Sequence, residues 1–332
     1  MARHSISIIF VLLSLNTSIR AQHRAGIIDV YGLQQLKKET LIDALGIKEG
    51  DSLTVSATTL TKRLLAVKGV KKAEVSFVCC DGGKELVYVG ISENNGPEIK
   101  YRRIRGSLHR LPDTLTKLHN QFFAALKVAV TKGDHADEFI NGYSLYKNPE
   151  VGAIQKKFLL LADFYRKELK LVLNHSTDQE QRAIAAVFIA YMSDKRQVAE
   201  QLNAAGNDPD PLVRNNVFRA FAALGAYAFE HPELQIRLKY DYFVSLLNSI
   251  YWSDRDKALF ALIPITQNLD PKLLASLKKG GIGALAEMSQ WRGREHAIMA
   301  CILLGRIQGW TDDQSFESWK NNDGKLLEKL HF

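Results

Sequence analysis

The stretch KKAEVSFVCCDGGKELVYVGISE, residues 71–93, predicts a β-hairpin and decides the fold of the first part of this chain. Small or apolar residues alternate with polar ones from Ala73 to Phe77, with the period of a half-buried strand. Residues 81–83, Asp-Gly-Gly, have the composition of a hairpin turn. A second apolar run follows the turn and ends at Glu93. The two runs therefore predict neighbouring antiparallel strands.

The residues before this hairpin predict one further strand and two helices. An apolar run at residues 27–31 ends at Gly32, and a helical stretch follows it with apolar side chains on one face. A turn then precedes a second helix, which carries Leu60 and Leu64 at helical spacing. Two helices with apolar stripes must cover one face of a small sheet. The sequence thus predicts an α+β domain, in the order β-α-α-β-β, over residues 24–94.

This arrangement resembles a POTRA domain, the polypeptide-transport-associated module of outer-membrane assembly, secretion and cell-division proteins. The resemblance implies a domain that docks a partner by adding a strand to the edge of its sheet. Another small α+β domain is the alternative fold. The residues that carry the resemblance are the turn at Gly32, the corner at Leu45-Gly46-Ile47 and Gly50-Asp51, Gly69-Val70, Ala73-Glu74-Val75 and the closing Glu93.

Residues 1–21 have the composition of a secretory signal peptide. Arg3 precedes an apolar run at residues 6–15, a polar stretch follows, and Ala21 is the expected cleavage point. The apolar run is too short to span a bilayer as a helix. We therefore expect an exported protein that lies in the periplasm of a Gram-negative cell. An uncleaved membrane anchor is the alternative.

The charge balance is moderately basic. The chain has 44 Lys and Arg against 36 Asp and Glu, a formal net charge of +8. Without Arg3 and Arg20 of the predicted signal peptide, the balance is 42 − 36 = +6. Such an excess suits acidic protein surfaces, cell-wall polymers or anionic lipid headgroups. We expect protein partners in the envelope and no nucleic acid, and leave peripheral contact with an anionic membrane surface open.

The three cysteines are too few for a disulfide framework. Cys79 and Cys80 are adjacent at the end of a predicted strand, whereas Cys301 lies in a helical region. A bridge from either of the first two to Cys301 would clamp the two parts of the chain, and the sequence leaves their oxidation state open. No cysteine has a histidine at the spacing of a zinc site, so we expect no metal.

From residue 112 onward the pattern becomes helical, which predicts an all-α domain over residues 112–332. One of the expected helices covers residues 136–146. Four arginines begin similar segments, each followed three positions later by a small or branched residue. They are Arg182, Arg214, Arg255 and Arg294, at intervals of 32, 41 and 39 residues.

These intervals resemble the repeats of HEAT and armadillo proteins, whose periods are roughly 40–47 residues. The segment at residues 207–214, Asn-Asp-Pro-Asp-Pro-Leu-Val-Arg, is similar to the turn between HEAT repeats. The resemblance implies an α-solenoid of stacked helix pairs. It also implies that Asp210 and Arg214 belong to a ladder of ion pairs between repeats. An irregular all-α bundle is the alternative.

The two predicted domains are joined by a basic linker at residues 95–111, which follows an Asn-Asn-Gly-Pro boundary signal. Its cations cluster beside an aromatic ring, a combination suited to an acidic protein patch or to anionic lipid. A solvated linker without a partner is the alternative. The candidate partner-binding residues are Tyr101, Arg102, Arg103 and Arg105.

The sequence offers no convincing catalytic constellation. Ser276 and Lys279 fit a Ser-x-x-Lys pattern, but the companion motifs are missing. We therefore predict no catalytic residues and no cofactor. The expected function is a non-catalytic periplasmic scaffold or adaptor tied to outer-membrane protein assembly, secretion or envelope organisation. An envelope enzyme with its site in the helical domain is the alternative, and the partner and oligomeric state are left open.

Overall fold

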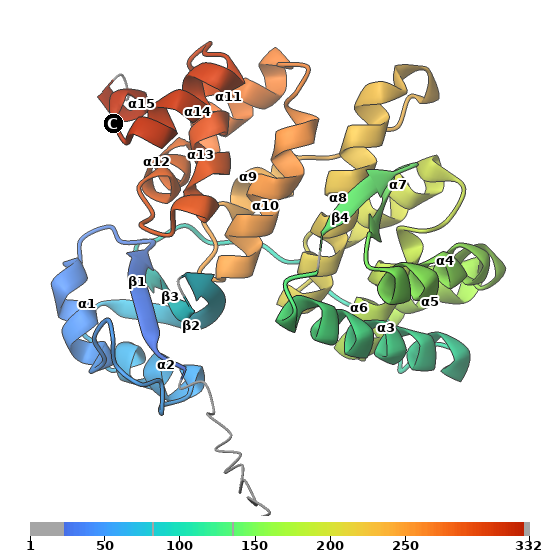
Figure 1. The fold of residues 1–332 in the computed structure, drawn as a ribbon, viewed down its shortest axis with the longest axis horizontal. Helices are drawn as coiled ribbons and strands as arrows, with labels where there is room; N and C mark the ends of the chain where they lie inside the picture. The colour runs from blue at the N-terminus through green and yellow to red at the C-terminus, as the bar shows by residue number, and fades with distance from the viewer. Residues whose placement is uncertain (1–22, 82, 135, 329–332) are drawn as a thin grey trace, which may run out of the picture.

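The computed structural model describes residues 23–81, 83–134 and 136–328 (Figure 1). The predicted signal peptide, residues 1–21, lies outside the described residues, and so do the side chains of Cys79 and Cys80. A small sheet with two covering helices comes first, and a mostly helical region follows it. The prediction of an α+β part before a mostly helical part is confirmed.

The N-terminal domain is built on a three-stranded sheet. The strand β3 lies in the middle of the sheet, parallel to β1 and antiparallel to β2. The elements follow the predicted β-α-α-β-β order, and the hairpin joins β2 to β3. Their bounds are β1 (Ala25–Tyr31), α1 (Lys38–Leu45), α2 (Ala57–Leu65), β2 (Val70–Asp81) and β3 (Lys84–Glu93).

One face of this sheet is covered by α1 and α2. Each helix presents two leucines spaced four residues apart, and all four are fully buried. Gly46 ends α1 with a φ of 64°, and the Ser56 hydroxyl accepts a hydrogen bond from the N–H of Thr59 to begin α2. The leucines and the strand residues that meet them are Leu41, Leu45, Leu60, Leu64, Val75, Val87, Val89 and Ile91.

Glu93, at the end of β3, fixes the loop between β1 and α1. Its carboxylate accepts hydrogen bonds from the backbone N–H groups of Gln34, Gln35 and Leu36, at 2.7–3.1 Å. Desolvation would raise the pKa of Glu93, but these three N–H groups stabilise the charged form and the net shift is downward. Glu93 is therefore a structural residue that orders the start of α1.

The remaining helices pack in a regular pattern. The helices α6, α8, α10 and α13 lie in a row in which each packs against the next, and α5, α7, α9, α11 and α12 flank them (Figure 1). The bounds are α3 (Asp113–Thr131), α4 (Pro149–Phe164), α5 (Arg166–His175), α6 (Gln179–Ile189), α7 (Lys195–Ala205), α8 (Pro211–Glu230), α9 (Asp241–Leu246), α10 (Trp252–Ile265), α11 (Pro271–Gly280), α12 (Ile282–Ser289), α13 (Arg294–Ile307), α14 (Asp312–Asn321) and α15 (Lys325–Glu328).

A short hairpin of β4 (Asp137–Ile140) and β5 (Tyr143–Tyr146) lies between α3 and α4. The helix predicted for residues 136–146 is therefore wrong, and the domain is not purely α-helical. Asn141 and Gly142 have φ values of 49° and 77°, the left-handed conformation that tight hairpin turns require. The Asn-Gly pair overrides the helical spacing of the apolar residues around it.

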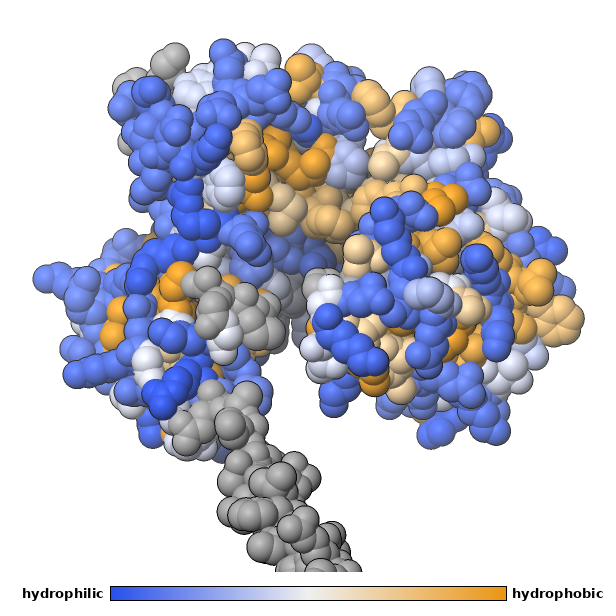
Figure 2. Space-filling model, viewed as in Figure 1, coloured by the Kyte–Doolittle hydropathy of each residue, from blue (hydrophilic) through white to orange (hydrophobic). Residues whose placement is uncertain are grey.

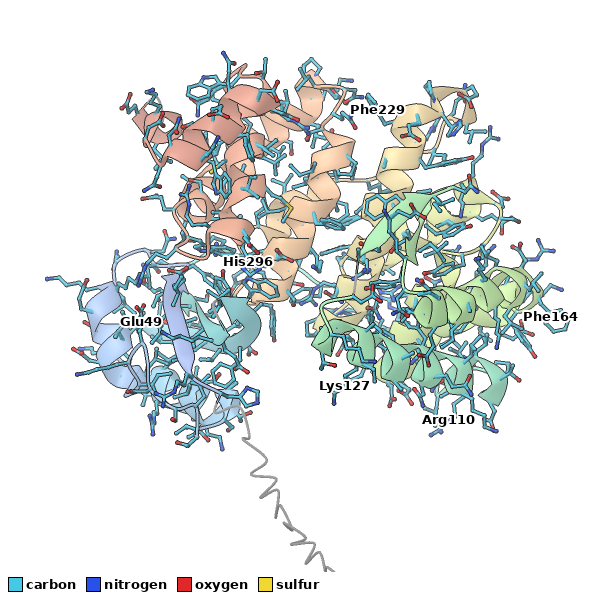
Figure 3. All side chains as sticks on the ribbon, viewed as in Figure 1. Glu49, Arg110, Lys127, Phe164, Phe229 and His296 are labelled. Carbon is cyan, nitrogen blue, oxygen red and sulfur yellow. The ribbon has the colours of Figure 1, made fainter. Side chains whose placement is uncertain are left out.

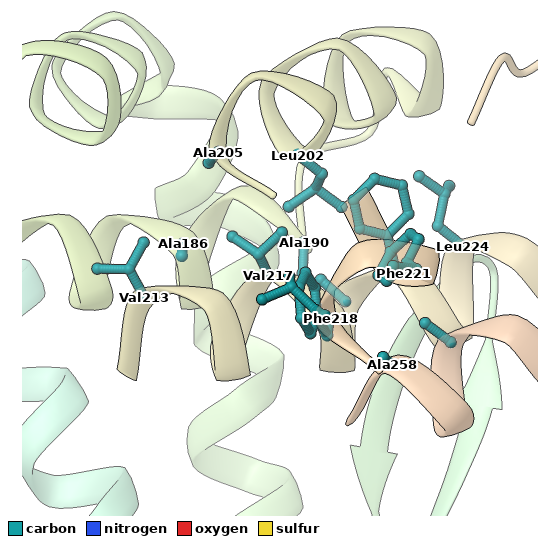
Figure 4. Close-up of a cluster of buried hydrophobic side chains, with 14 of the residues drawn as sticks. Ala186, Ala190, Leu202, Ala205, Val213, Val217, Phe218, Phe221, Leu224 and Ala258 are labelled. Atoms are coloured by element: carbon teal, nitrogen blue, oxygen red, sulfur yellow. The ribbon is translucent and has the colours of Figure 1, made fainter. Parts of the chain in front are cut away.

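The centre of the helical packing is α8 (Figure 4). Its side chains Val217, Phe218 and Phe221 are fully buried. They meet small residues on the neighbouring helices, including Ala186 of α6 and Ala258 of α10 (Figure 4). Short alanine side chains let three helices approach α8 closely, so one continuous core runs through the region. Within the described residues, no helix is long and apolar enough to cross a bilayer.

Candidate partner-binding site

The second face of the N-terminal sheet packs against the helical domain. The Tyr31 hydroxyl donates a hydrogen bond to the carbonyl of Ile250, at 2.8 Å. A methyl group on Gly90 would lie only 1.9 Å from the same carbonyl oxygen, so only glycine allows this approach. The two domains are in direct contact through the backbone of β3.

An ion pair of the helical domain lies close to this contact. The Arg255 guanidinium lies 4.4 Å from the centre of the Tyr31 ring and pairs with Glu287 at 2.7 Å. The second carboxylate oxygen of Glu287 accepts a hydrogen bond from the N–H of Gly32, also at 2.7 Å. Burial raises the pKa of Tyr31 far above its usual value, so the hydroxyl stays protonated as a donor. One cation and one carboxylate from the helical domain therefore hold the end of β1.

Aromatic rings fill the centre of the junction. Tyr88 of β3 stacks on Trp252 at 5.4 Å between ring centroids and contacts Trp291 at 5.0 Å. Its hydroxyl lies 2.6 Å from Nδ1 of His296, which Figure 3 labels between the domains. Burial lowers the pKa of His296, so its neutral form is favoured there. The cluster joins the sheet to α10 and α13.

The far side of the junction is held by carboxylates of the N-terminal domain. The buried carboxylate of Asp29 accepts hydrogen bonds from the backbone N–H groups of Arg292 and Gly293, at 2.9 and 3.3 Å. Burial raises the pKa of Asp29, and the two N–H groups oppose that shift. Glu49 forms an exposed ion pair with the Arg292 side chain at 2.5 Å. Contacts on both sides of the aromatic cluster fix the N-terminal domain in place.

Residues 97–111 form an extended strap across the helical domain. The N–H of Arg102 donates to the carbonyl of Asn207 at 2.8 Å, and the N–H of Thr177 donates to the carbonyl of Ser107 at 3.0 Å. A methyl group on Gly106 would lie 1.9 Å from the carbonyl oxygen of His175, the last residue of α5. The segment predicted to be a basic linker is therefore anchored along its length.

The four candidate residues of this strap have two different environments. The Tyr101 ring is half-buried, 4.5 Å from the guanidinium of Arg214. The Arg102 guanidinium donates to Asp208 and to the carbonyl of Leu173, both at 2.6 Å. Arg103 and Arg105 are exposed, and their side chains form no ion pair with a described residue. The structure therefore leaves only Arg103 and Arg105 free to meet a partner.

Buried ion pairs connect successive helices. The Asp208 carboxylate forms ion pairs with Arg182, at 3.0 Å, and with Arg102. Arg214 pairs with Asp254 at 2.7 Å. Asp210 instead caps α8, where it accepts hydrogen bonds from two backbone N–H groups. Arg214 is thus part of a series of ion pairs. Its partner Asp254 lies on α10, the next helix of the row. Sequence reasoning missed Asp208 and Asp254 because their arginine partners lie 26 and 40 residues away and leave no local signal.

A polar pocket of about 320 Å³ opens where the sheet, the strap and the helical domain meet. Lys71 of β2 pairs with Glu98 of the strap at 2.6 Å, whereas the exposed Lys72 forms no ion pair with a described residue. Tyr251 also borders this space. We call this space the junction pocket; its lining includes Lys71, Lys72, Ser92, Glu98, Tyr251 and Glu287.

The two edges of the sheet differ beside this pocket. The loop before α2 covers β1, since the N–H of Ala25 donates to Asp51 and the N–H of Gly50 donates to the carbonyl of Ala25. β2 is the other edge strand, and from residue 71 to 78 its described backbone hydrogen bonds go only to β3. Glu74, half-buried on β2, has a pKa raised by burial and forms no ion pair with a described residue. An open edge thus runs along β2.

No protein-family model matches the chain, and no curated protein matches it either. Within the described residues, no group of three or more His, Cys, Asp or Glu side chains is placed to hold a metal ion. Cys301 is a free, buried thiol, and burial raises its pKa to about 11. The resemblances to POTRA and HEAT proteins therefore rest on the sequence motifs.

Proposed function

We propose that this protein is a non-catalytic interaction scaffold of the bacterial cell envelope. In this proposal a POTRA-like domain and a HEAT-like solenoid form one platform that holds an extended segment of a protein partner along β2. The observation that carries it is the open edge of β2 beside the junction pocket. The opposite edge and both faces of the same sheet are already occupied.

Strand addition suits this edge for a physical reason. The unpaired N–H and C=O groups of an edge strand gain hydrogen bonds when another strand pairs with them, and pockets beside the edge select side chains. Charged side chains on an edge also discourage indiscriminate pairing. Lys71, Lys72 and Glu74 supply such charges on β2. The free Lys72 favours a partner segment with an acidic residue at that position.

The helical domain supports the scaffold role by its stacking. The row of α6, α8, α10 and α13 and the buried pairs Arg182–Asp208 and Arg214–Asp254 resemble the stacking of solenoid repeats. Stacked helices present a broad surface, and Figure 2 shows a hollow between the N-terminal domain and α3. The envelope assignment draws on the signal-like residues 1–21 and on the POTRA resemblance. The chain would act as an adaptor in outer-membrane assembly, secretion or envelope organisation.

Photo-crosslinking along β2 tests the proposal. A photoreactive amino acid is placed at Lys72 and, separately, at Ser76 of the chain in its native envelope. Since residues advance equally along paired strands, the two positions should crosslink to residues about four apart in one partner segment. The matched control is Lys278, an exposed lysine on α11. Crosslinks to unrelated segments, or the same capture from Lys278, would show that β2 is not the docking edge.

A further inference from the structure

The end of α4 carries the most exposed large apolar side chains of the described chain. Leu160 is 78% exposed and Phe164 is 76% exposed. Their spacing of four residues places them side by side on one face of the helix. Figure 3 shows Phe164 pointing outward at the margin of the molecule. We call residues 156–167, which surround these two side chains, the α4 tip.

The fold does not need these two apolar groups. The buried side of α4 is formed by Val151, Phe158 and Ala162, which belong to the main core. Leu160 and Phe164 project away from that side, so their exposure is not a consequence of packing α4. Two adjacent apolar side chains that project from a helix into solvent are instead suited to entering an apolar environment.

Cations surround the two apolar side chains. Lys156 and Lys157 lie one turn before Leu160, and Arg166 and Lys167 follow Phe164 at the start of α5. All four are exposed, and none forms an ion pair with a described residue. The nearby carboxylate of Asp163 accepts a hydrogen bond from the N–H of Ser193 at 3.1 Å. Exposed Glu168 follows Lys167, so four cations stand against two carboxylates over residues 156–168. The α4 tip therefore combines protruding apolar groups with an excess of positive charge.

We propose that the α4 tip docks on an anionic lipid surface. Leu160 and Phe164 would enter the headgroup region, and the four cations would bind lipid phosphates around them. A protein partner fits less well, because a stable interface covers about 800 Å² on each side. Even a fully buried aromatic side chain contributes only about 150–250 Å². The tip lies at the opposite end of the molecule from β2 (Figure 1), so this proposal does not depend on strand addition there.

Binding to vesicles tests this proposal. The purified full chain is sedimented with phosphatidylcholine vesicles and with vesicles that contain about a third phosphatidylglycerol. Wild-type chain should bind the anionic vesicles, less so when salt rises from about 0.1 M to about 0.5 M. Leu160→Ser with Phe164→Ser should weaken that binding about tenfold. Leu212→Ser, at a 55% exposed leucine on α8, is the matched control and should bind as wild type does.

Hydrogen–deuterium exchange locates the contact and separates it from the apolar residues 6–15, which every variant shares. Anionic vesicles should slow amide exchange at residues 156–167. Unchanged exchange there, equal binding by the double variant, or an equal loss in the Leu212 variant would overturn the proposal. So would a dimer, measured by sedimentation velocity without lipid, that Leu160→Ser and Phe164→Ser abolish. That result would assign the tip to contact between copies of this chain.

Discussion

The domain junction and the α4 tip use the same kinds of side chain in opposite ways. At the junction, Arg255 is 2% exposed, lies over the buried ring of Tyr31 and is neutralised by Glu287. At the tip, Phe164 is exposed to solvent, and Arg166 beside it forms no ion pair with a described residue. Rings and cations that are buried and paired build structure, whereas exposed and unpaired ones are available for recognition. Substitutions at the junction should therefore reduce stability, and substitutions at the tip should not.

Glu287→Ala is the strongest test of the junction. It would leave the buried Arg255 without a counter-ion and the N–H of Gly32 without an acceptor. Removing one member of a buried ion pair costs about 3–5 kcal/mol, and we expect a loss in the free energy of unfolding near the lower end of that range. Urea denaturation measures it. Glu287→Gln, which retains an acceptor for Gly32, should lose less; an equal loss would show that the charge is unimportant.

Gly90→Ala tests the close approach of the two domains. The added methyl group would meet the carbonyl oxygen of Ile250 at 1.9 Å, so the sheet must move away from α10. Overpacking of this kind costs typically about 1–3 kcal/mol. The control is Gly283→Ala on α12, where the added methyl group meets no atom within 4 Å. Small-angle X-ray scattering should show a more extended molecule for Gly90→Ala alone; unchanged scattering and stability would contradict the described docking.

The His296–Tyr88 contact gives the junction a pH dependence. Burial lowers the pKa of His296 from 6.5, so just below pH 6.5 the unfolded chain binds more protons than the folded protein. Stability is therefore complete above pH 6.5 and decreases as the pH falls, by at most about 1.4 kcal/mol per pH unit. His296→Asn should flatten this slope in urea denaturation between about pH 5 and 8.

Burial also lowers the pKa of His119, on α3 and away from the junction. His119→Asn is the matched variant for the pH experiment. This substitution should remove the contribution of His119 to the pH dependence of stability. The contribution of His296 should remain. If His296→Asn keeps the full wild-type slope, the junction histidine is not held in its neutral form.

The parts of the fold that sequence predicts are those with local patterns. Alternation from Ala73 to Phe77 and leucines four residues apart define the N-terminal strands and helices within one segment each. The β4–β5 hairpin also had a local signal, because Asn141-Gly142 is a preferred hairpin turn. The helix predicted there followed the spacing of apolar residues and neglected this pair.

The parts that sequence does not predict depend on distant partners. Tyr101 and Arg102 were candidate partner-binding residues together with Arg103 and Arg105, yet the first two contact Arg214 and Asp208. Those contacts join residues more than 100 positions apart, which no periodicity in the strap encodes. The docking of the N-terminal sheet is of the same kind, since it requires glycine at position 90 and the backbone of Ile250 to meet. Only the structure shows which arginines of the strap are paired with other side chains and which are exposed and unpaired.

Arg292→Ala should have the smallest effect on stability of the junction substitutions, and it decides whether burial is the relevant difference. Arg292 crosses the same junction as Arg255, but its side chain is 53% exposed and that of Glu49 is 42% exposed. Exposed ion pairs contribute about 0–1 kcal/mol and are screened by salt. The expected loss in the free energy of unfolding is under about 0.5 kcal/mol, close to zero for Lys156→Ala at the tip. A loss as large as that of Glu287→Ala would mean that position in the junction, and not burial, determines what a charged pair contributes.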